Sequence, residues 1–89
     1  MEFDWDEANE EHIGQHDVDA AEAEEALSDP DATPAHAHRG PSGDPRGAVV
    51  GQTEDGRYLF VVFIVRAGSI RVITARDATQ TEKRRYRQR

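Results

Sequence analysis

The chain contains no cysteine, so no disulfide stabilises its fold. It also lacks a long apolar segment. Its longest uncharged apolar run, residues 58–65, is too short to cross a membrane as a helix. The first residues are acidic, whereas a secretory signal begins with basic ones. These absences predict a soluble, cytoplasmic protein that does not associate with a membrane.

Lysine is nearly absent as well, because one lysine stands against ten arginines. This arginine-rich and strongly acidic composition, with a net charge of −7, resembles that of salt-adapted proteins. Residues 1–45 carry a charge of −13 and residues 46–89 a charge of +6. Such asymmetry suggests an anionic partner for the basic half, or acidic helices that neutralise a basic sheet within the molecule.

The 89 residues predict one domain over residues 1–89, which begins with two helices. Asp6 can cap a helix that runs to about residue 16, and Asp19-x-x-Glu22 opens a second helix. Residues 29–47 hold all four prolines and three of the seven glycines, so they predict a loop with room for a short extended segment near residues 35–38.

Strand patterns follow this loop over residues 48–53, 57–66 and 69–76. The middle strand is apolar at its odd-numbered and its even-numbered positions alike, which predicts a central position in the sheet with both faces covered. A capping box at Thr79 then opens a C-terminal helix, and Phe3 and Trp5 fit a short edge strand. We therefore expect an α+β fold, with a small antiparallel sheet packed against two N-terminal helices and a C-terminal helix.

The turn between the last two strands predicts where two arginines lie. If residues 67–68 form a two-residue loop, Arg66 faces Ser69 and Ile64 faces Arg71, so both arginines share a sheet face. Two positive charges at such a short distance repel each other. Their proximity makes better sense if they bind one anion, and phosphate suits arginine well.

The preceding turn decides the position of Arg46. A three-residue turn over residues 54–56, with Gly56 left-handed, adds Arg46 to the face of Arg66 and Arg71, whereas a two-residue turn puts it on the opposite face. We favour the three-residue turn. The alternative for each arginine is a solvated strand end that pairs with a carboxylate of the first two helices. We favour this alternative for Arg57 and expect its removal to change little.

Several segments also match a known family. They are Phe3-Asp4-Trp5-Asp6, Asn9, His16, residues 18–27, Asp29-Pro30, Arg46, Gly51, residues 70–76, Ala78, Glu82 and Tyr86. Through them the chain resembles the BrnT-type toxins, the ribonuclease components of type II toxin–antitoxin systems. The resemblance implies a RelE-like fold and metal-independent cleavage of RNA without a cofactor. It also implies neutralisation by a cognate BrnA-type antitoxin, through which any contact with DNA would be indirect.

The resemblance also implies the functional residues. The catalytic candidates are His16, Arg66, Arg71 and Glu82, and the RNA-binding candidates are Arg46, Arg76 and Tyr86. The chain departs from the family at three places: Gln15-His16-Asp17 replaces a frequent Lys-His-Gly, Asn9 replaces a lysine, and Pro45 replaces an acidic residue. Two positive charges are therefore missing.

A metal-free mechanism assigns roles to these side chains. The RNA 2′-hydroxyl attacks its own phosphate while arginines stabilise the charge that develops on the phosphate oxygens. His16 suits acid–base catalysis, but it also suits a helix cap. Glu82 is a base, a residue that orients Arg71 or Arg76, or the capping partner of Thr79. Tyr86 lies one helical turn further on, where it stacks on a base or packs in the core.

Two other functions stay open. His12 and His16 lie at i, i+4, and His36 and His38 form a His-x-His pair, so four histidines provide ligands for a zinc site. A catalytically weakened member of the family would instead be a binding module that holds antitoxin or RNA without cleavage.

Overall fold

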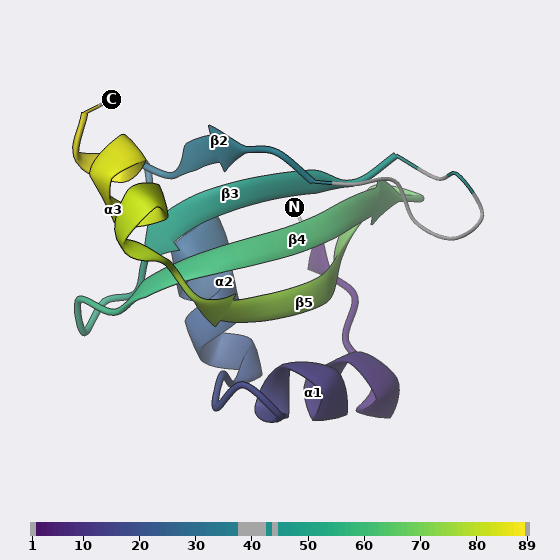
Figure 1. Cartoon of the computed structure of the whole chain (residues 1–89). Coiled ribbons are helices and arrows are strands. Elements are labelled where there is room, and N and C mark those ends of the chain that lie inside the picture. The colour runs from purple at the N-terminus through teal and green to yellow at the C-terminus, as the bar shows by residue number, and fades with distance from the viewer. Residues whose placement is uncertain (1, 38–42, 44, 89) are drawn as a thin grey trace.

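The computed structural model of the chain describes residues 2–37, 43 and 45–88. The elements are β1 (Glu2–Phe3), α1 (Glu7–Gly14), α2 (Ala20–Ser28), β2 (Thr33–Ala35), β3 (Gly47–Gln52), β4 (Tyr58–Arg66), β5 (Ser69–Asp77) and α3 (Gln80–Arg87) (Figure 1). Within these ranges, no helix has both the length and the apolar character needed to cross a membrane. The short extended segment predicted near residues 35–38 lies slightly earlier, as β2, and His38 falls outside the described residues.

The strands form one five-stranded sheet in the order β1-β5-β4-β3-β2. The α+β class is confirmed, but the sheet is mixed, because β1 runs parallel to β5 while the other neighbours are antiparallel. The expectation of an antiparallel sheet was wrong because β1 joins β5 across most of the chain, and no hairpin sets its direction. The RelE-like arrangement stays a prediction.

All three helices begin with the side-chain caps that the sequence predicts. Asp6 and Asp19 each accept a hydrogen bond from the backbone three residues later, and Thr79 does the same at α3. Helix α1 ends at Gly14, earlier than predicted, because the chain turns through a left-handed Asp17 (φ 58°) and the Val18 amide returns to the Ile13 carbonyl.

The main core lies between the sheet and the two early helices. It comprises Ile13, Val18, Ala23, Ala26, Leu59, Val61, Val72 and Ala75. Helix α2 lies so close to β3 that a Cβ on Gly51 would overlap the carbonyl of Ala26. Only glycine permits that approach.

Helix α3 lies on the opposite face of the sheet from α2, as Figure 1 shows. There Tyr86 packs with Val50 and Ala78 in a second, smaller cluster. The sequence predicted that both faces of the middle strand are covered, but not which helix lies on which face. Strand β4 is central as expected, but the cover does not reach its end, where Val65 is 59% exposed. The sheet face that carries α3 is open beside this helix, where two cavities lie along it.

Candidate functional site

Both turns have the geometry that places arginines on the open face. In the β4–β5 hairpin, Ile64 pairs with Arg71 and Arg66 pairs with Ser69, as predicted. The β3–β4 turn has three residues and a left-handed Gly56 (φ 92°), because the Thr53 amide still donates to the Arg57 carbonyl at 2.8 Å.

This second turn fixes the place of Arg46. Since Gly47 pairs with Phe63, Arg46 stands next to Ile64, the residue that Arg71 faces from the other side. The register that we favoured is thus the one observed.

A β-bulge brings one more arginine to this face. Val62 pairs with Thr74 but Phe63 pairs with Val72, so Ile73 is an extra residue in β5. Arg71 and Arg76 are five positions apart, and strict alternation would put them on opposite faces. The bulge reverses the alternation between them. Arg76 consequently pairs with Phe60 on the same face on which Arg71 pairs with Ile64.

Asn9 supports the strand beside the bulge. It is 5% exposed, and its Nδ2 donates to the carbonyls of Asp4 (3.0 Å) and Val72 (3.1 Å). It also serves as the capping-box partner of Asp6 in α1. Asn9 therefore attaches α1 to β5.

Two adjoining cavities of about 410 and 390 Å³ lie along the open face. The first is lined by Ala8, Asn9, His12, Arg46, Arg71, Val72, Ile73 and Thr74. The second is lined by His36, Ala37, Arg46, Phe60, Val62, Thr74, Arg76 and Glu82. Because Arg46 and Thr74 border both, we treat them as one feature, the arginine groove.

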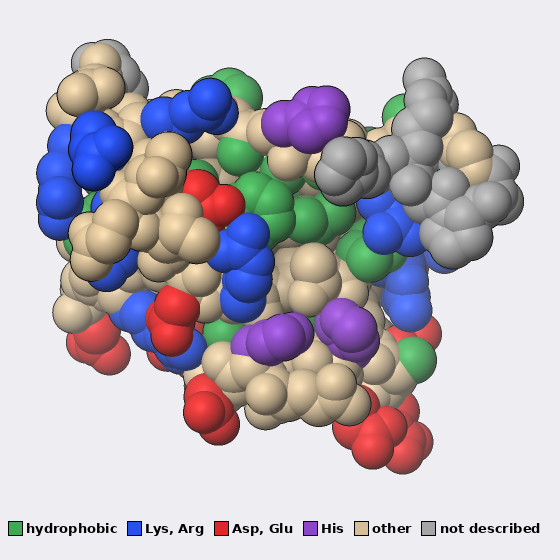
Figure 2. Space-filling model, in the orientation of Figure 1, with side chains coloured by type: hydrophobic (Ala, Val, Ile, Leu, Met, Phe, Trp, Pro, Cys, Tyr) green, Lys and Arg blue, Asp and Glu red, His purple; other side chains and the backbone are tan. Residues whose placement is uncertain are grey.

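The arginine groove has an apolar floor and a basic margin. Figure 2 shows hydrophobic side chains in the middle of this face, with Lys or Arg side chains on both sides and histidines above and below. Phe60 and Val62 form the floor of the second cavity. A flexible polyanion with flat, partly apolar groups suits such a surface.

Arg71 is held by two carboxylates at one end of the groove. Its Nη2 lies 3.1 Å from Oδ2 of Asp6, and its Nη1 lies 3.6 Å from Oδ2 of Asp4. The hydrogen bond from Arg71 lowers the pKa of Asp6, and the same contact raises the pKa of Arg71. Acidic residues of the N-terminal half thus neutralise part of the basic half, as one interpretation of the charge asymmetry predicted.

Arg76 is held by Glu82 in a bidentate pair. Nη1 lies 2.9 Å from Oε1 and Nη2 lies 3.0 Å from Oε2, while the guanidinium covers the Phe60 ring 4.2 Å from its centroid. Burial raises the pKa of Glu82, but the hydrogen bonds from Arg76 and from the Thr79 amide lower it more, so it falls below its ordinary value. A carboxyl that holds its proton so weakly is a poor general base near neutral pH. Of the roles considered for Glu82, the structure shows two, capping partner and orienting residue of Arg76.

The two histidines of the first helical region differ in position. His12 lines the arginine groove together with Arg46 and Arg71. His16 lies beyond the end of α1, is exposed, and does not line either cavity, although its ring is 6.0 Å from that of His12. From the sequence we considered His12 only as a metal ligand. Its i, i−4 spacing from His16 was the signal that could have identified it as a second acid–base candidate.

Two further predicted site residues lie outside the groove. Arg66 shares its face by register, but it is exposed at the hairpin end. Tyr86 is 6% exposed, stacks edge-to-face on Tyr58, and donates its hydroxyl hydrogen to Oδ2 of Asp29 at 2.7 Å. Its ring is therefore a core side chain, the structural role that the sequence also allowed.

Arg57 pairs with a helix carboxylate, as we expected, but its contacts are more extensive. Nε bonds Oδ1 of Asp77 at 2.8 Å, and Nη1 bonds both Glu22 of α2 and the Asp17 carbonyl. The Asp77 hydrogen bond raises the pKa of Arg57 despite partial burial. These contacts join the end of the sheet to the α1–α2 connection, so the expectation that Arg57 is dispensable needs revision for stability.

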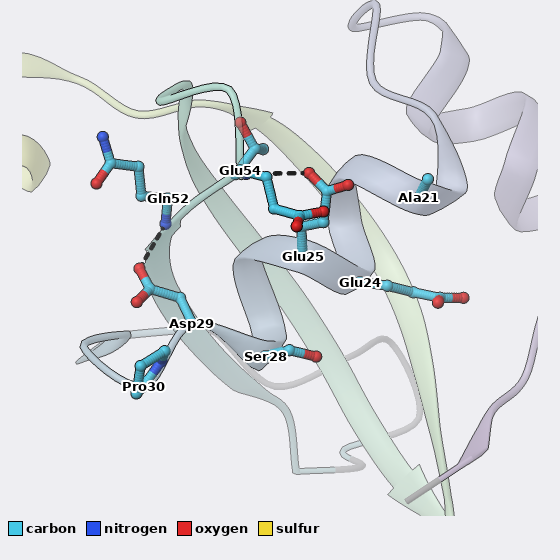
Figure 3. A pocket seen from close by; sticks show the side chains of 9 residues that line it. Ala21, Glu24, Glu25, Ser28, Asp29, Pro30, Gln52 and Glu54 are labelled. Carbon is cyan, nitrogen blue, oxygen red and sulfur yellow. Dashed lines mark hydrogen bonds between the residues drawn. The ribbon is translucent and has the colours of Figure 1, made fainter.

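A roomier cavity of about 520 Å³ lies away from the arginines, between α2 and the end of β3 (Figure 3). Its charged lining is acidic: Glu24, Glu25, Asp29 and Glu54. Two of these carboxylates already accept backbone hydrogen bonds, Asp29 from the Gln52 amide and Glu25 from the Glu54 amide. Such a lining repels a polyanion, so size alone does not identify the functional site.

A zinc site finds no support in the part of the chain that the structure describes. There, no group of three or more His, Cys, Asp or Glu side chains is arranged to hold a metal ion. His38, one of the four histidines considered, lies outside those residues.

A family model described as the ribonuclease toxin, BrnT, of a type II toxin–antitoxin system matches residues 5–82. The match covers the residues that form the arginine groove, from α1 to the start of α3. No curated protein matches the chain.

Proposed function

Because this chain belongs to the BrnT family of type II ribonuclease toxins, we propose that it cleaves RNA in the arginine groove. The observation that carries the proposal is the gathering of Arg46, Arg71 and Arg76 along one open sheet face, which depends on the bulge at Ile73. Apolar strands gain no stability from such a row of like charges, whereas a phosphodiester backbone does bind to it.

The proposed reaction needs no metal. The RNA 2′-oxygen forms a bond to the adjacent phosphorus while the bond from phosphorus to the 5′-oxygen breaks. A base removes the proton of the 2′-hydroxyl, and an acid gives a proton to the leaving 5′-oxygen. The products are a 2′,3′-cyclic phosphate and a free 5′-hydroxyl, and no oxidant or cofactor is consumed.

The side chains divide this work. Arg71 and Arg76 bind phosphate oxygens and stabilise the charge of the transition state, and Arg46 borders both cavities where they meet. His12 and His16 are the acid–base candidates, because imidazole both gives and accepts protons near neutral pH. Arg66 binds the RNA backbone further along the face.

Glu82 and Tyr86 act as positioning residues. Glu82 orients the Arg76 fork through two hydrogen bonds. Tyr86 fixes α3, from which Glu82 projects, through its bond to Asp29. Substrate binding requires Arg71 and Arg76 to exchange some of their carboxylate contacts for phosphate, which lowers net affinity but keeps the guanidinium groups oriented in the free protein.

We further propose that a cognate antitoxin of BrnA type neutralises the protein and that the topology is RelE-like. Type II systems pair a toxin with a protein antitoxin, so membership of the family supports an antitoxin as a partner of this chain. Co-expression with the neighbouring gene product should yield a stable complex with no RNA cleavage. A complex that cleaves RNA as fast as the free chain would contradict neutralisation.

The test of cleavage uses purified protein with a single-stranded RNA, with and without EDTA, at low and high salt. We expect cleavage that EDTA does not affect and a cyclic phosphate terminus by mass spectrometry. Cleavage lost in EDTA would contradict the metal-free mechanism. RNA binding without cleavage under every condition would contradict the ribonuclease and leave a binding module.

A matched pair of variants locates the chemistry. His12→Asn removes the imidazole inside the groove, and His16→Asn removes the one outside it. If His12 transfers a proton, its loss lowers kcat by about 100-fold or more, in the usual range for general acid–base catalysis. Full activity in both variants would exclude His12 and His16 from the reaction.

A further inference from the structure

A third cavity, of about 240 Å³, lies between β2, the sheet and the start of α3. We call it the α3 pocket. Its lining residues are Thr33, Pro34, Ala35, His36, Val50, Phe60, Thr79, Thr81, Glu82 and Arg85. Val50, Phe60, Ala35 and Pro34 make an apolar interior, and hydroxyl groups and charged groups of α3 stand at its margin.

The α3 pocket continues the arginine groove. His36, Phe60 and Glu82 line both the pocket and the second cavity of the groove, so the two cavities adjoin. The Arg76 guanidinium, which the proposed function assigns to a phosphate, covers the Phe60 ring at 4.2 Å. A phosphate on Arg76 would thus lie within one nucleotide of the pocket.

The chemistry of the pocket fits a nucleobase. A base has apolar faces and a polar edge, which matches an apolar interior with Thr81 and Arg85 at the margin. Proteins that bind single-stranded nucleic acid combine a basic track for the backbone with aromatic contacts for the bases. The volume lies below the range of about 300–1,000 Å³ typical of sites for drug-sized ligands, so a single ring system is the appropriate size.

We infer that the α3 pocket binds one nucleobase of a single-stranded RNA whose phosphate Arg76 holds, and that Phe60, Thr81 and Arg85 select this base. The inference rests on the proposed function, because it takes RNA as the ligand of the arginine groove. It adds a substrate class, since a base inside a duplex cannot leave its stack to enter the pocket without a cost in unpairing. The cationic Arg76 and Arg85 beside the pocket favour an anionic chain over a peptide segment.

The test blocks the pocket and removes the base separately. Thr81 is exposed on α3, so Thr81→Trp adds an indole at the margin of the pocket without altering the core. Gln80→Trp is the control, because Gln80 is exposed, precedes Thr81 in the same helix and does not line the pocket. The probes are short single-stranded RNAs made uncleavable by 2′-O-methyl groups, each with one abasic nucleotide at a different position.

In the unaltered protein, one abasic position should weaken binding about tenfold, the usual scale for a stacked base. In Thr81→Trp, the intact RNA should bind about tenfold more weakly, and the abasic penalty should vanish because no base is bound there. Gln80→Trp should reproduce the unaltered protein. Arg85→Ala, which adds no bulk, should change the preference among the four bases at that position.

The outcomes separate this inference from the ribonuclease proposal. Cleavage-competent protein with no abasic penalty, or with the same penalty in Thr81→Trp, would overturn the base pocket and leave the ribonuclease intact. A clear penalty in a protein that never cleaves RNA would overturn the ribonuclease and leave the pocket. If Thr81→Trp loses the antitoxin but keeps the full abasic profile, the pocket binds a protein partner and the inference is wrong.

Discussion

Arg76 and Glu82 form a two-hydrogen-bond pair, at 2.9 and 3.0 Å, that joins the end of β5 to the first turn of α3. The Glu82 carboxylate also accepts a hydrogen bond from the Thr79 amide at 2.8 Å. One carboxylate thus caps a helix and orients a guanidinium that lies over the Phe60 ring. The direction of Arg76 is therefore set by the structure before any ligand binds.

Glu82→Gln distinguishes a positioning role from a role as general base. Glutamine keeps the capping geometry but removes the charge that competes with phosphate for Arg76. We expect affinity for uncleavable RNA to rise up to about fivefold, the equivalent of the ~1 kcal/mol upper range for an accessible ion pair. Cleavage should change by less than about tenfold. A loss of 100-fold or more in kcat with unchanged affinity would instead identify Glu82 as the base.

The control for Glu82→Gln is Glu54→Gln. Glu54 lies in the exposed β3–β4 turn on the acidic side of the molecule, away from the arginine groove. Its substitution removes the same single charge, so it measures the general effect of net charge on RNA affinity. An equal gain in affinity in both variants would mean that Glu82 does not compete with RNA for Arg76.

Arg71→Ala should mainly weaken RNA binding, whereas Arg57→Ala should mainly lower the stability of the fold. Loss of Arg71 should weaken RNA binding at least about tenfold, because a charge-assisted contact to phosphate is lost, and reduce the salt slope by about one contact. Its two carboxylate partners are accessible, so stability should fall by less than about 1 kcal/mol.

Loss of Arg57 should leave RNA affinity within about twofold but lower the free energy of unfolding by about 1–2 kcal/mol. It removes bonds to Asp77, to Glu22 and to the Asp17 carbonyl at once. RNA binding by fluorescence anisotropy and urea unfolding of both variants provide the comparison. If Arg57→Ala weakens RNA binding more than Arg71→Ala does, the basic surface has been placed on the wrong part of the molecule.

The Arg76–Glu82 pair should make stability depend on pH in the acid range. The folded pKa of Glu82 lies below the ordinary 4.5, so the pair contributes fully above that pH and the contribution is lost as pH falls through the folded pKa. The difference in unfolding free energy between the unaltered protein and Glu82→Gln should be about 1 kcal/mol near pH 7 and vanish once the pH falls below the folded pKa of Glu82. Arg76→Ala should abolish most of this pH dependence, because Arg76 is the main group that lowers the pKa. A difference that stays constant from pH 7 to pH 3 would contradict the pairing.

Gly51→Ala tests the close approach of α2 to β3. An added Cβ meets the backbone of Ala26, which no side-chain rotation can relieve, so we expect a loss of about 1–3 kcal/mol in unfolding free energy. Gly14→Ala is the matched control, because a Cβ there has nothing within 4 Å and alanine suits a helix better. It should leave stability unchanged or raise it by up to about 1 kcal/mol. Equal values for the two variants would show that the helix and strand separate easily.

Much of the fold could be predicted because the relevant signals are local. The caps at Asp6, Asp19 and Thr79 need only a residue three positions away, and both hairpin registers follow from a turn of two or three residues. The ends of β3, β4 and β5 shifted by a residue at most, for example from 48–53 to Gly47–Gln52. The parallel pairing of β1 escaped prediction because its partner lies at the other end of the chain.

The candidate site was predicted less completely. Arg46 and Arg71 were placed together correctly because turn geometry controls them. His12 was passed over in favour of His16, since one turn of helix decides which imidazole reaches the groove and helix ends are set by tertiary contacts. Glu82 was among the residues expected to orient Arg76, but the carboxylates that hold Arg71 were not assigned, because Asp4 and Asp6 approach Arg71 only through the sheet.

The sequence by itself determined the family, the hairpins and the helix caps, because these depend on residues that are neighbours along the chain. The tertiary structure alone decided that Arg71 and Arg76 share a face. The spacing of five forbids it in a regular strand, and the extra residue Ile73 permits it. A bulge forms where two strands and the adjoining helix can accommodate it, and here Asn9 of α1 bonds the carbonyl of Val72 beside it. Whether a bulge fits at this position depends on packing between segments that are distant along the chain, so no local sequence pattern predicts it.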